Sequence, residues 1–431
     1  MRRSVVVVGG GIAGLSAALE AAQAGARVTV LEGSRWLGGK LRTVDGREAG
    51  AENFLMRAPA GGPSAAVVLA QEVGLGADIV HPTGFGAGLY LDGALKALPG
   101  GTMLGIPGPD TDLGGIAQRA GHDVDQGKPV LAQGEDAAVG EVVRERMGDD
   151  VVAKLVDPLL GGVYAGRADG LSVAATMPGL HRLLQTENTL SAAVGRAISA
   201  SKAHSGGPVF GTVVGGLSRL VEALVNRLVE LGVTVKTEAV VRDLSEVDAD
   251  GVVLAVPGGK ARRLLPELGA VEVDYASVGL VTLRFPKVSL PELSGFLVPE
   301  NEGLQIKAAT FFTSKWEHLR GGSVLIRASL GRAQSPEVLQ RGDDDLARTA
   351  RTDLRQVLGD LPEPVQVSVD RWGGGLPQYA PGHLARVAAV RASLEDSPIA
   401  LAGAAYDGIG IPACVSSGRA AAQTLMRKWG L

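Results

Sequence analysis

The sequence contains one cysteine, no apolar run near the length of about 18 residues that a spanning helix needs, and no block of basic residues. The lone Cys414 cannot form an internal disulfide, and the charged and apolar segments of a secretory signal do not follow Met1, which predicts a cytosolic chain. With 42 Lys and Arg against 46 Asp and Glu, an electrostatic basis for nucleic-acid binding is missing. We therefore expect no nucleic-acid partner and at most peripheral membrane contact.

Histidines are few and scattered. The six, at positions 81, 122, 181, 204, 318 and 383, show no H-x-x-x-H or Cys/His spacing, so no metal site is expected. His383 follows Pro381 and Gly382, and we expect a structural role for it in that turn.

Glycine is abundant instead, at 62 of 431 residues. It does not recur with period three, which excludes collagen, and a hydrophobic content of 45% is too high for a disordered glycine-rich polymer. The length predicts two to three domains at about 150 residues each. The positions of the glycines are therefore the informative feature.

The first glycine cluster follows a β-branched run. Ser4 to Val8 has the pattern of a parallel strand buried on both faces, and Gly9, Gly11 and Gly14 fill a G-x-G-x-x-G template after it. A helical pattern, a stop at Gly25 and a second strand ending at Glu32 come next. Such glycines allow a tight turn and close approach of a pyrophosphate, and an acid at this distance binds ribose hydroxyls, so the segment predicts a dinucleotide site.

The second glycine cluster bears on the choice between NAD and FAD. Ser34 to Thr43, with Gly38 and Gly39, resembles the R-x-G-G-R-x-x-[ST] segment of FAD oxidases of the amine-oxidase type, although Lys40 stands where Arg is usual. The alternative is a Gly-Gly hairpin beside a solvated basic residue. At this distance from the first motif, the segment favours FAD.

The rest of the chain alternates between α/β, mixed and helical patterns. We expect a loop over Pro99 to Pro109, a mainly helical region over 111–205, antiparallel strands over 277–285 and 323–330, and a last helix ending near Lys428. Val139, Val142, Val143 and Met147 form an apolar helical stripe typical of core packing. The predicted domains are an FAD-binding domain (1–60, 206–275 and 395–431), a substrate domain (61–110 and 276–394) and a helical domain (111–205).

Longer motifs resemble a known family, the porphyrinogen oxidases of haem biosynthesis. The matching segments follow family order over nearly the whole chain: Asp157 to Gly166, Gly215 to Leu220, Arg371-Trp372 with Pro377-Gln378-Tyr379 and Gly382-His383, and Gly403 to Gly418. Leu98 to Gly101, Leu104 to Pro107 and Gly410-Ile411-Pro412 look like the Gram-positive branch, whose product is coproporphyrin III.

This resemblance implies a fold and a reaction. The fold class is α/β combined with α+β: a Rossmann-like, p-hydroxybenzoate-hydroxylase-like FAD domain in discontinuous segments, a mixed-sheet substrate domain and a helical domain. The implied reaction is oxidation of coproporphyrinogen III by FAD in three two-electron steps, with oxygen as acceptor and hydrogen peroxide as by-product. A haem-pathway chelatase is an open alternative as a partner, and nothing in the sequence identifies one.

The resemblance also implies which residues contact FAD. They are Gly9, Gly10, Gly11, Ile12, Ala13, Gly14, Glu32, Gly33, Gly38, Gly39, Lys40, Gly50, Ala51, Glu52, Asn53, Val240, Trp372, Gly403, Ile409, Gly410 and Ile411. Asn53 departs from the small or acidic residue expected after Glu52. Pro412 fits a helix start that would direct the positive end of the last helix at the flavin.

Three roles stay open at this point. Trp372 either flanks the flavin or fills a core gap. Cys414 is expected to be a small buried core residue, with a nucleophile as the alternative. The substrate propionates call for Arg or Lys, and the candidates are Arg57, Lys96, Lys307, Lys315 and Arg371, each of which is otherwise a surface charge. No catalytic acid or base is forced by the sequence.

Other functions remain as alternatives. Protoporphyrinogen IX is the nearest alternative substrate. An amine oxidase or carotenoid desaturase on the same FAD frame, and a non-catalytic FAD-fold binding module, belong to different classes.

Overall fold

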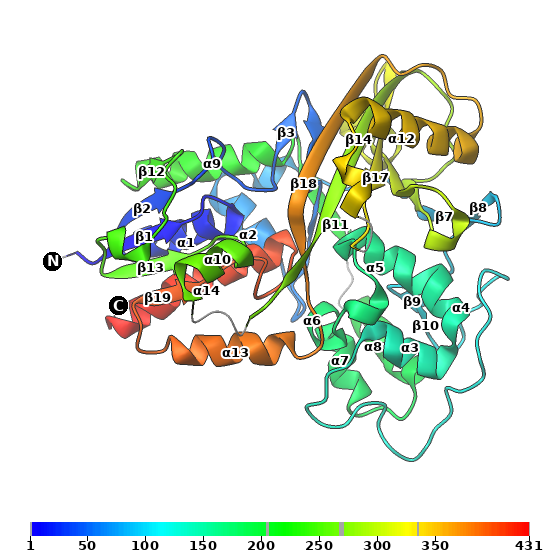
Figure 1. Cartoon of the computed structure of the whole chain (residues 1–431), viewed down its shortest axis with the longest axis horizontal. Coiled ribbons are helices and arrows are strands. Elements are labelled where there is room, and N and C mark those ends of the chain that lie inside the picture. Colours follow the sequence, from blue (N-terminus) through cyan, green and yellow to red (C-terminus); the bar gives the residue numbers. More distant parts are fainter. Residues whose placement is uncertain (1, 204–206, 267–270, 334–335, 431) are drawn as a thin grey trace. The chain divides into compact units, whose positions relative to one another are not determined.

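The computed structural model describes residues 2–203, 207–266, 271–333 and 336–430, and these form two compact units (Figure 1). Unit 1 comprises Met1–His81, Pro208–Val273 and His383–Leu431, and unit 2 comprises Pro82–Gly207 and Asp274–Gly382. Each unit is therefore assembled from separate stretches of the sequence. The three-domain division, with 111–205 as a domain of its own, stays a prediction.

Unit 1 is built on a five-stranded parallel sheet with the order β12-β2-β1-β13-β19. The strands are β1 (Ser4–Val8), β2 (Arg27–Leu31), β12 (Thr234–Lys236), β13 (Gly251–Leu254) and β19 (Ile399–Leu401). A helix-bearing connection joins β1 to β2, as the sequence pattern predicts.

Helices cover both faces of this sheet. They are α1 (Ile12–Gln23), α2 (Ala65–Glu72), α9 (Leu217–Glu230) and α14 (Ile411–Lys428) on one face, and α10 (Gly258–Leu264) and α13 (His383–Ser393) on the other. Val5 and Val7 of β1 point into the first core, whereas Val6 and Val8 pack in the second. Burial on both faces explains why the strand is a continuous β-branched run.

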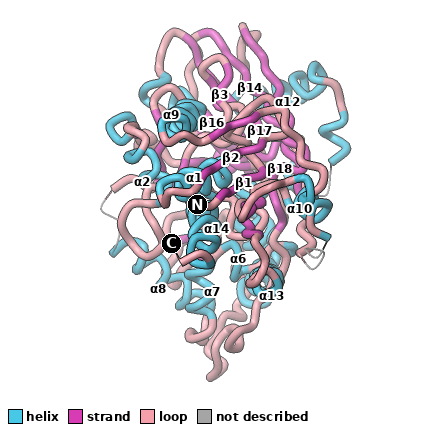
Figure 2. The backbone as a smooth tube through the Cα atoms, turned by 90° about the vertical axis from the view of Figure 1, so that its left-hand side faces the viewer, coloured by secondary structure: helices cyan, strands magenta, loops and turns pink. Residues whose placement is uncertain are grey.

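The two ends of the described chain lie together in unit 1 (Figures 1 and 2). The Arg3 guanidinium lies 5.6 Å from the centroid of the Trp429 ring. Further inside, α14 crosses α1 so closely that a Cβ on Gly418 would lie 2.0 Å from the Ala13 carbonyl oxygen. The first and last helices therefore share one core.

The remaining elements of unit 1 are short. Three antiparallel strands have the order β5-β11-β6, and β3 and β4 form a hairpin. Their bounds are β3 (Thr43–Val44), β4 (Arg47–Glu48), β5 (Phe54–Leu55), β6 (Ile79–Val80) and β11 (Phe210–Val213), with 3-10 turns η1 (Gly76–Asp78) and η4 (Leu244–Glu246).

Unit 2 contains a seven-stranded sheet with the order β18-β14-β17-β16-β15-β7-β8. All neighbouring pairs are antiparallel except β15 and β7. The strands are β7 (Ala87–Leu91), β8 (Ala94–Ala97), β14 (Asp274–Pro286), β15 (Gly295–Leu297), β16 (Ile306–Phe311), β17 (Ser323–Leu330) and β18 (Gln366–Gln378). Helix α12 (Asp343–Leu358) packs its apolar side onto the core of this sheet. The antiparallel strands predicted at 277–285 and 323–330 are confirmed as β14 and β17, and the structure shows that they pair with each other.

The rest of unit 2 combines helices with irregular segments. The helices are α3 (Val139–Met147), α4 (Asp149–Val151), the π-helical turn η2 (Val152–Val156), α5 (Asp157–Tyr164), α6 (Val173–Thr176), α7 (Pro178–Leu184), α8 (Leu190–Ala203) and α11 (Phe312–Lys315). The 3-10 turns are η3 (Ala168–Gly170), η6 (Glu300–Glu302), η7 (Glu317–Leu319) and η8 (Pro336–Gln340). The predicted stripe of α3 is buried, from Val139 to Met147.

Two sequence-based expectations differ from the structure in unit 2. Residues 111–138 contain no helix, and this stretch is rich in Gly and contains Pro129. The expected loop at Pro99–Pro109 contains a small hairpin, β9 (Thr102–Met103) and β10 (Ile106–Pro107). Its two turn residues, Leu104 and Gly105, have φ of +47° and +85°, as a tight hairpin turn requires.

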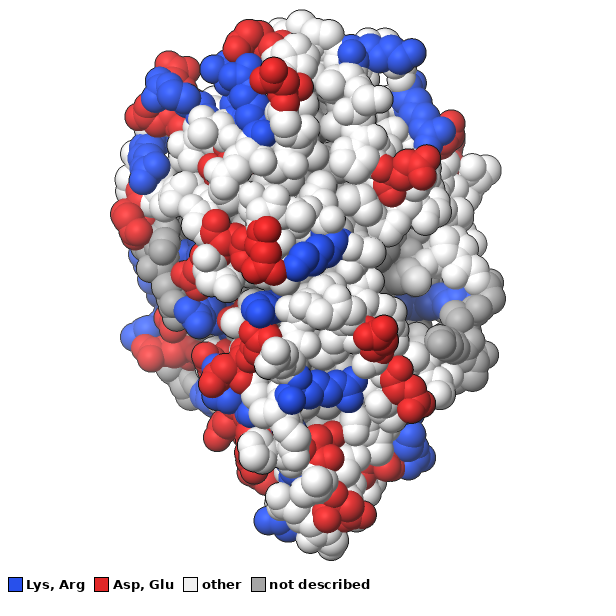
Figure 3. Space-filling model, turned by 90° about the vertical axis from the view of Figure 1, so that its right-hand side faces the viewer, with Lys and Arg blue, Asp and Glu red and all other residues white. Residues whose placement is uncertain are grey.

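Among the described residues, no helix is both long enough and apolar enough to cross a membrane. On the face drawn in Figure 3, acidic and basic side chains are interspersed. This mixture fits the small net charge of −4.

Candidate functional site

Three glycines of the G-x-G-x-x-G motif, two in the turn between β1 and α1 and one in the first turn of α1, have different steric requirements. Gly9 has φ +112°, and a Cβ there would lie 2.4 Å from the Ala255 carbonyl oxygen. A Cβ on Gly14 would lie 1.9 Å from the Gly9 carbonyl oxygen. At Gly11, by contrast, an added Cβ meets no protein atom within 4 Å. The fold itself needs Gly9 and Gly14, whereas Gly11 suits the close approach of another molecule.

The amino end of α1 offers backbone donors at the same place. Its N-cap is Gly11, and no side chain caps the helix. The first N–H groups of a helix have no acceptor within it, and its positive end attracts anions. The residues from Gly11 to Gly14 therefore fit the phosphates of a dinucleotide.

Glu32 lies at the carboxyl end of β2, beside the glycine turn. Its carboxylate accepts the Gly10 N–H at 2.7 Å and the Ser34 N–H at 2.7 Å. These two bonds fix the carboxylate at the edge of the sheet where ligands of parallel α/β folds bind. A carboxylate held there fits the hydroxyls of a ribose.

The second glycine motif folds back onto the first. The Gly38 N–H donates to the Gly10 carbonyl at 2.8 Å, and a Cβ on Gly39 would lie 3.3 Å from the Cα of Gly11. The Ala51 N–H donates to the Lys40 carbonyl at 3.0 Å, which brings the segment 50–53 to the same place.

Segments from later in the chain reach this region too. A Cβ on Gly33 would lie 3.3 Å from Cγ2 of Val240, which is half exposed. A Cβ on Gly403 would lie 3.8 Å from Cβ of Ala13. Every predicted cofactor residue except Trp372 belongs to unit 1. Trp372 lies on β18 of unit 2, in contact with the small core of Ala276 and Val278, so its role at the cofactor stays a prediction.

In unit 1, Lys40 and Cys414 lie close enough for each to act on the pKa of the other. Burial lowers the pKa of the Lys40 amine, while the nearby Cys414 acts in the opposite direction. Burial raises the pKa of the Cys414 thiol to about 11, and its Sγ donates to the Gly408 carbonyl at 3.6 Å. Cys414 belongs to the core between α1 and α14, which confirms the expected buried residue.

Side chains of α13 and α14 hold the loop before α14 by hydrogen bonds that the sequence did not indicate. The Arg391 guanidinium of α13 donates to Asp407, and the Ser417 hydroxyl donates to the same carboxylate. The Ser417 hydroxyl in turn accepts the Gly403 N–H at 3.0 Å.

Helix α14 itself begins with Gly410 as N-cap and Pro412 in its first turn, without a side-chain cap. His383, at the start of α13, is buried with a ring nitrogen 3.3 Å from the Tyr406 carbonyl oxygen.

The five basic candidates for substrate carboxylates are dispersed. Arg57 is an exposed residue of unit 1. In unit 2, Lys96 pairs with Asp92 at 2.7 Å, and the Lys315 amine lies 5.6 Å from the centroid of the Trp316 ring.

Arg371 and Lys307 differ sharply in their surroundings. Arg371 on β18 donates to the carboxylate of Asp343 and to the carbonyl oxygens of Leu339 and Arg341, so much of its guanidinium is engaged within unit 2. Lys307 on β16 is only 4% exposed.

Comparisons with known proteins agree with this geometry. The family model of flavin containing amine oxidoreductases matches residues 12–426. A coproporphyrinogen III oxidase of Mycobacterium tuberculosis is 38% identical, covering 97% of this chain and 96% of its own. One of Bacillus subtilis is 30% identical, covering 97% of both chains. The crystal structure of a putative protoporphyrinogen oxidase from Exiguobacterium superposes with a TM-score of 0.85, 29% identity and 99% coverage of both chains.

A doubly covered parallel sheet with a glycine-rich turn and an anchored acid fits a dinucleotide-binding protein, and the family match makes it a flavin-dependent oxidoreductase. The chain belongs to the flavin-containing amine oxidoreductase family and, within it, to the porphyrinogen oxidases. FAD is its cofactor.

Proposed function

We propose that this flavoprotein oxidises coproporphyrinogen III to coproporphyrin III in haem biosynthesis, with molecular oxygen as the electron acceptor. The observation that carries the proposal is the full-length similarity, at 38% identity, to a relative named coproporphyrinogen III oxidase. The motifs Leu98 to Gly101 and Gly410 to Pro412 support the same substrate.

The balance of the reaction follows from its chemistry. The macrocycle loses six electrons and six protons in three equal steps. When bound, FAD accepts a hydride equivalent from the macrocycle in each step and is reoxidised by oxygen. Each oxygen molecule takes up two electrons and two protons and leaves as hydrogen peroxide.

The residues of unit 1 have separate parts in this proposal. Gly9 to Gly14 bind the pyrophosphate through backbone N–H groups, and Glu32 binds a ribose. The amino end of α14 stabilises negative charge on the flavin. The other contacts are Gly33, Gly38, Gly39, Lys40, Gly50, Ala51, Glu52, Asn53, Val240, Trp372, Gly403, Ile409, Gly410 and Ile411. A cytoplasmic location with at most peripheral membrane contact is part of the proposal and is tested by cell fractionation.

Protoporphyrinogen IX is the alternative substrate, and it is supported by the structural likeness to the putative protoporphyrinogen oxidase of Exiguobacterium. The two substrates differ in charge, since coproporphyrinogen carries four propionates and protoporphyrinogen two. The ratio of kcat/KM for the two porphyrinogens separates the alternatives.

The decisive experiment is anaerobic mixing of the FAD-loaded protein with coproporphyrinogen III, followed by air. We expect bleaching of the flavin, then porphyrin fluorescence and hydrogen peroxide in a ratio of one porphyrin to three peroxides. A kcat/KM higher for protoporphyrinogen IX would move the assignment to the alternative. Bleaching by putrescine or another amine, without bleaching by either porphyrinogen, would overturn both.

A further inference from the structure

Lys307 occupies an irregular position in the sheet of unit 2. On β16, Ile306 pairs with Leu330 of β17, but the next registered pair is Ala308 with Ser329, so Lys307 is the extra residue of a β-bulge. Ile306 and Ala309, three residues apart, consequently both pack in the core under α12. In a regular strand the side chains alternate between the two faces of the sheet, and a bulge of this kind redirects a side chain out of that alternation.

Arg332 and the backbone of Lys307 both form hydrogen bonds with one residue, Val298. The Val298 N–H donates to the Lys307 carbonyl at 2.9 Å, and the Val298 carbonyl accepts from Nη2 of Arg332 at 3.3 Å. Three segments of unit 2, the end of β15, the bulge of β16 and the residues after β17, therefore converge here.

Neither cation has a carboxylate of its own. In the described part of the chain, Lys307 makes no ion pair and no side-chain hydrogen bond, and Arg332 makes no ion pair within 4.0 Å. Lys307 is 4% exposed and Arg332 is half-buried. A buried ammonium without a partner is costly, so lysines are rarely found in this state without a reason.

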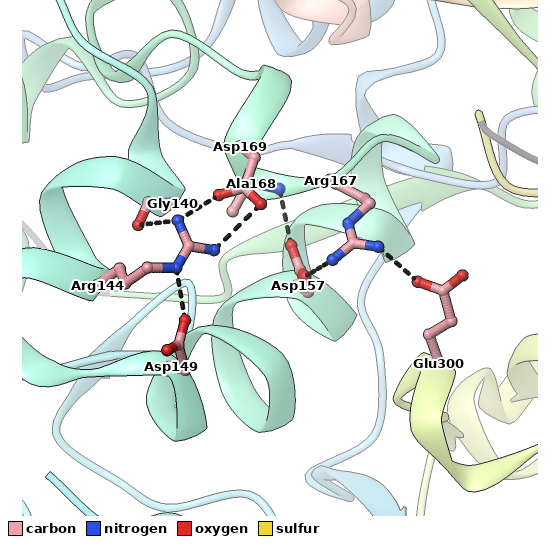
Figure 4. A network of polar contacts seen from close by, with 8 residues as sticks. All are labelled: Gly140, Arg144, Asp149, Asp157, Arg167, Ala168, Asp169 and Glu300. Atoms are coloured by element: carbon pink, nitrogen blue, oxygen red, sulfur yellow. Dashed lines mark hydrogen bonds and ion pairs between the residues drawn. The ribbon is translucent and has the colours of Figure 1, made fainter.

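Asp157 and Glu300, the acids that act electrostatically on Arg332, have other partners, and so does Asp353. Figure 4 shows Arg167 between Asp157 and Glu300, with nitrogen–oxygen distances of 3.8 and 3.1 Å. The Asp157 carboxylate also accepts the Ala168 N–H at 2.7 Å. On the α12 side, the Asp353 carboxylate accepts the N–H groups of Gln305 and Ile306 at 2.8 and 2.9 Å.

Lys307 and Arg332 therefore form a site with an excess of positive charge. Burial lowers the pKa of Lys307 to about 7, and the neighbouring Arg332 acts in the same direction. Burial also lowers the pKa of Arg332, whereas Glu300 and Asp157 raise it and Arg167 lowers it further. The lysine is thus poised to gain a proton when an anion arrives.

We propose that Lys307 and Arg332 together bind a carboxylate, and that this carboxylate is a propionate of the porphyrinogen. The second part rests on the proposed function, since it takes the substrate from there. A carboxylate between an ammonium and a guanidinium makes charge-assisted hydrogen bonds to both. Binding takes up a proton at Lys307, so affinity falls as the pH rises from about 6 to about 8.5.

Two isosteric variants and one control test the proposal. Lys307→Met and Arg332→Met keep the apolar stems and remove the charge, and removal of an unpaired buried charge leaves folding intact or improves it. Lys154→Met is the control, because Lys154 is a cation of the same unit that is already paired with Asp150 and is not a substrate candidate. All four FAD-loaded proteins are titrated with coproporphyrin III at about pH 6 and about pH 8.5, with porphyrin fluorescence as the readout.

We expect wild type and Lys154→Met to bind more tightly at the lower pH. Lys307→Met should bind about tenfold or more weakly at the lower pH and lose the pH dependence, since a hydrogen bond to a charged group contributes about 1.5–3 kcal/mol. Arg332→Met should weaken binding at both pH values. Equal affinities for wild type and Lys307→Met, or an equal loss in Lys154→Met, would overturn the site.

Sodium propionate alone separates the site from the proposed function. It should raise the thermal midpoint of wild type above that in sodium chloride of equal ionic strength, and should not do so for Lys307→Met. If propionate acts in this way but no porphyrinogen is oxidised, the anion site stands and the proposed function fails. If porphyrinogen is oxidised but propionate and coproporphyrin III bind wild type and Lys307→Met alike, the function stands and the site fails.

Discussion

Arg391 donates to both carboxylate oxygens of Asp407, with nitrogen–oxygen distances of 2.7 and 2.6 Å. This fork joins α13 to the loop that runs from β19 to α14, and the hydrogen bond to Asp407 raises the pKa of Arg391 further above its ordinary value. Ser417, in the second turn of α14, donates to the same carboxylate. The loop that supplies Gly403 to Gly410 is thus held from both sides.

Breaking the Arg391–Asp407 pair should affect FAD binding more than the stability of the fold. In Asp407→Asn the bidentate pair is lost, and because both side chains are partly exposed the global stability should fall by less than about 1 kcal/mol. We expect FAD to dissociate several times faster, since the loop that we propose contacts the flavin is no longer fixed. Stopped-flow measurement of flavin release after dilution checks this. Glu230→Gln, which breaks the exposed Arg227–Glu230 pair of α9, should leave the release rate unchanged.

Gly11 allows the cofactor site to be tested apart from folding. Gly11→Ala introduces a methyl group that meets no protein atom within 4 Å, and its φ of −72° suits alanine. The apoprotein should therefore unfold at the wild-type temperature. The methyl group should crowd the pyrophosphate and cost about 1–3 kcal/mol of binding, or roughly five- to 150-fold in Kd.

The comparison is made by titrating apoprotein with FAD and by a thermal scan. Gly259→Ala in α10, where an added Cβ also meets nothing within 4 Å, is the matched control and should bind FAD normally. A lower unfolding temperature in Gly11→Ala with unchanged Kd would contradict the assignment.

Cys414 should be unreactive in the folded protein at neutral pH. Burial raises the pKa of its thiol to about 11, from an ordinary value of 9.0, so the reactive thiolate is scarce below that pH. A disulfide reagent at about pH 8 should label the denatured chain at once and the native holoprotein far more slowly. Because Cys414 is the only cysteine, the labelling ratio refers to this residue alone. Rapid native labelling would reopen the reading of Cys414 as a nucleophile.

The same shift sets the sign of a pH effect on stability. Because the pKa of the thiol is higher in the folded state, the protonated thiol contributes to the free energy of unfolding. This contribution is complete below the ordinary pKa of 9.0, and it is lost as the pH rises from 9.0 to about 11. Cys414→Ala removes this dependence, so the unfolding temperature of the variant should fall less steeply over that range than the wild type.

Local patterns made the cofactor half of the molecule predictable from sequence. The strand, the glycine turn, α1 and Glu32 follow one another within about thirty residues, and Gly9 and Gly14 each have a steric reason in the structure. Residues 111–205 were predicted to be mainly helical, but the glycines and the proline of 111–138 favour the irregular structure observed there.

Long-range pairings were not predictable in the same way. Arg391 meets Asp407 only because α13 packs beside the loop before α14, and no spacing in the sequence indicates it. Lys307 was among the predicted substrate contacts, but Arg332 was not, because their proximity depends on the register of β16 and β17 and on one bulge. A single-residue shift in register is invisible in composition or periodicity.

The amino end of α14 should tune the flavin's reduction potential. The helix begins without a side-chain cap, so its positive end is not compensated locally, and we propose that it faces the flavin pyrimidine. In Pro412→Asp an acid in the first turn should oppose negative charge on the reduced cofactor and lower the two-electron midpoint potential by about 10–40 mV. Ala420→Asp adds the same charge at an exposed position farther along α14, and its potential should stay close to that of wild type. Equal potentials in all three proteins, measured by dye-coupled reductive titration, would mean that α14 does not act on the flavin.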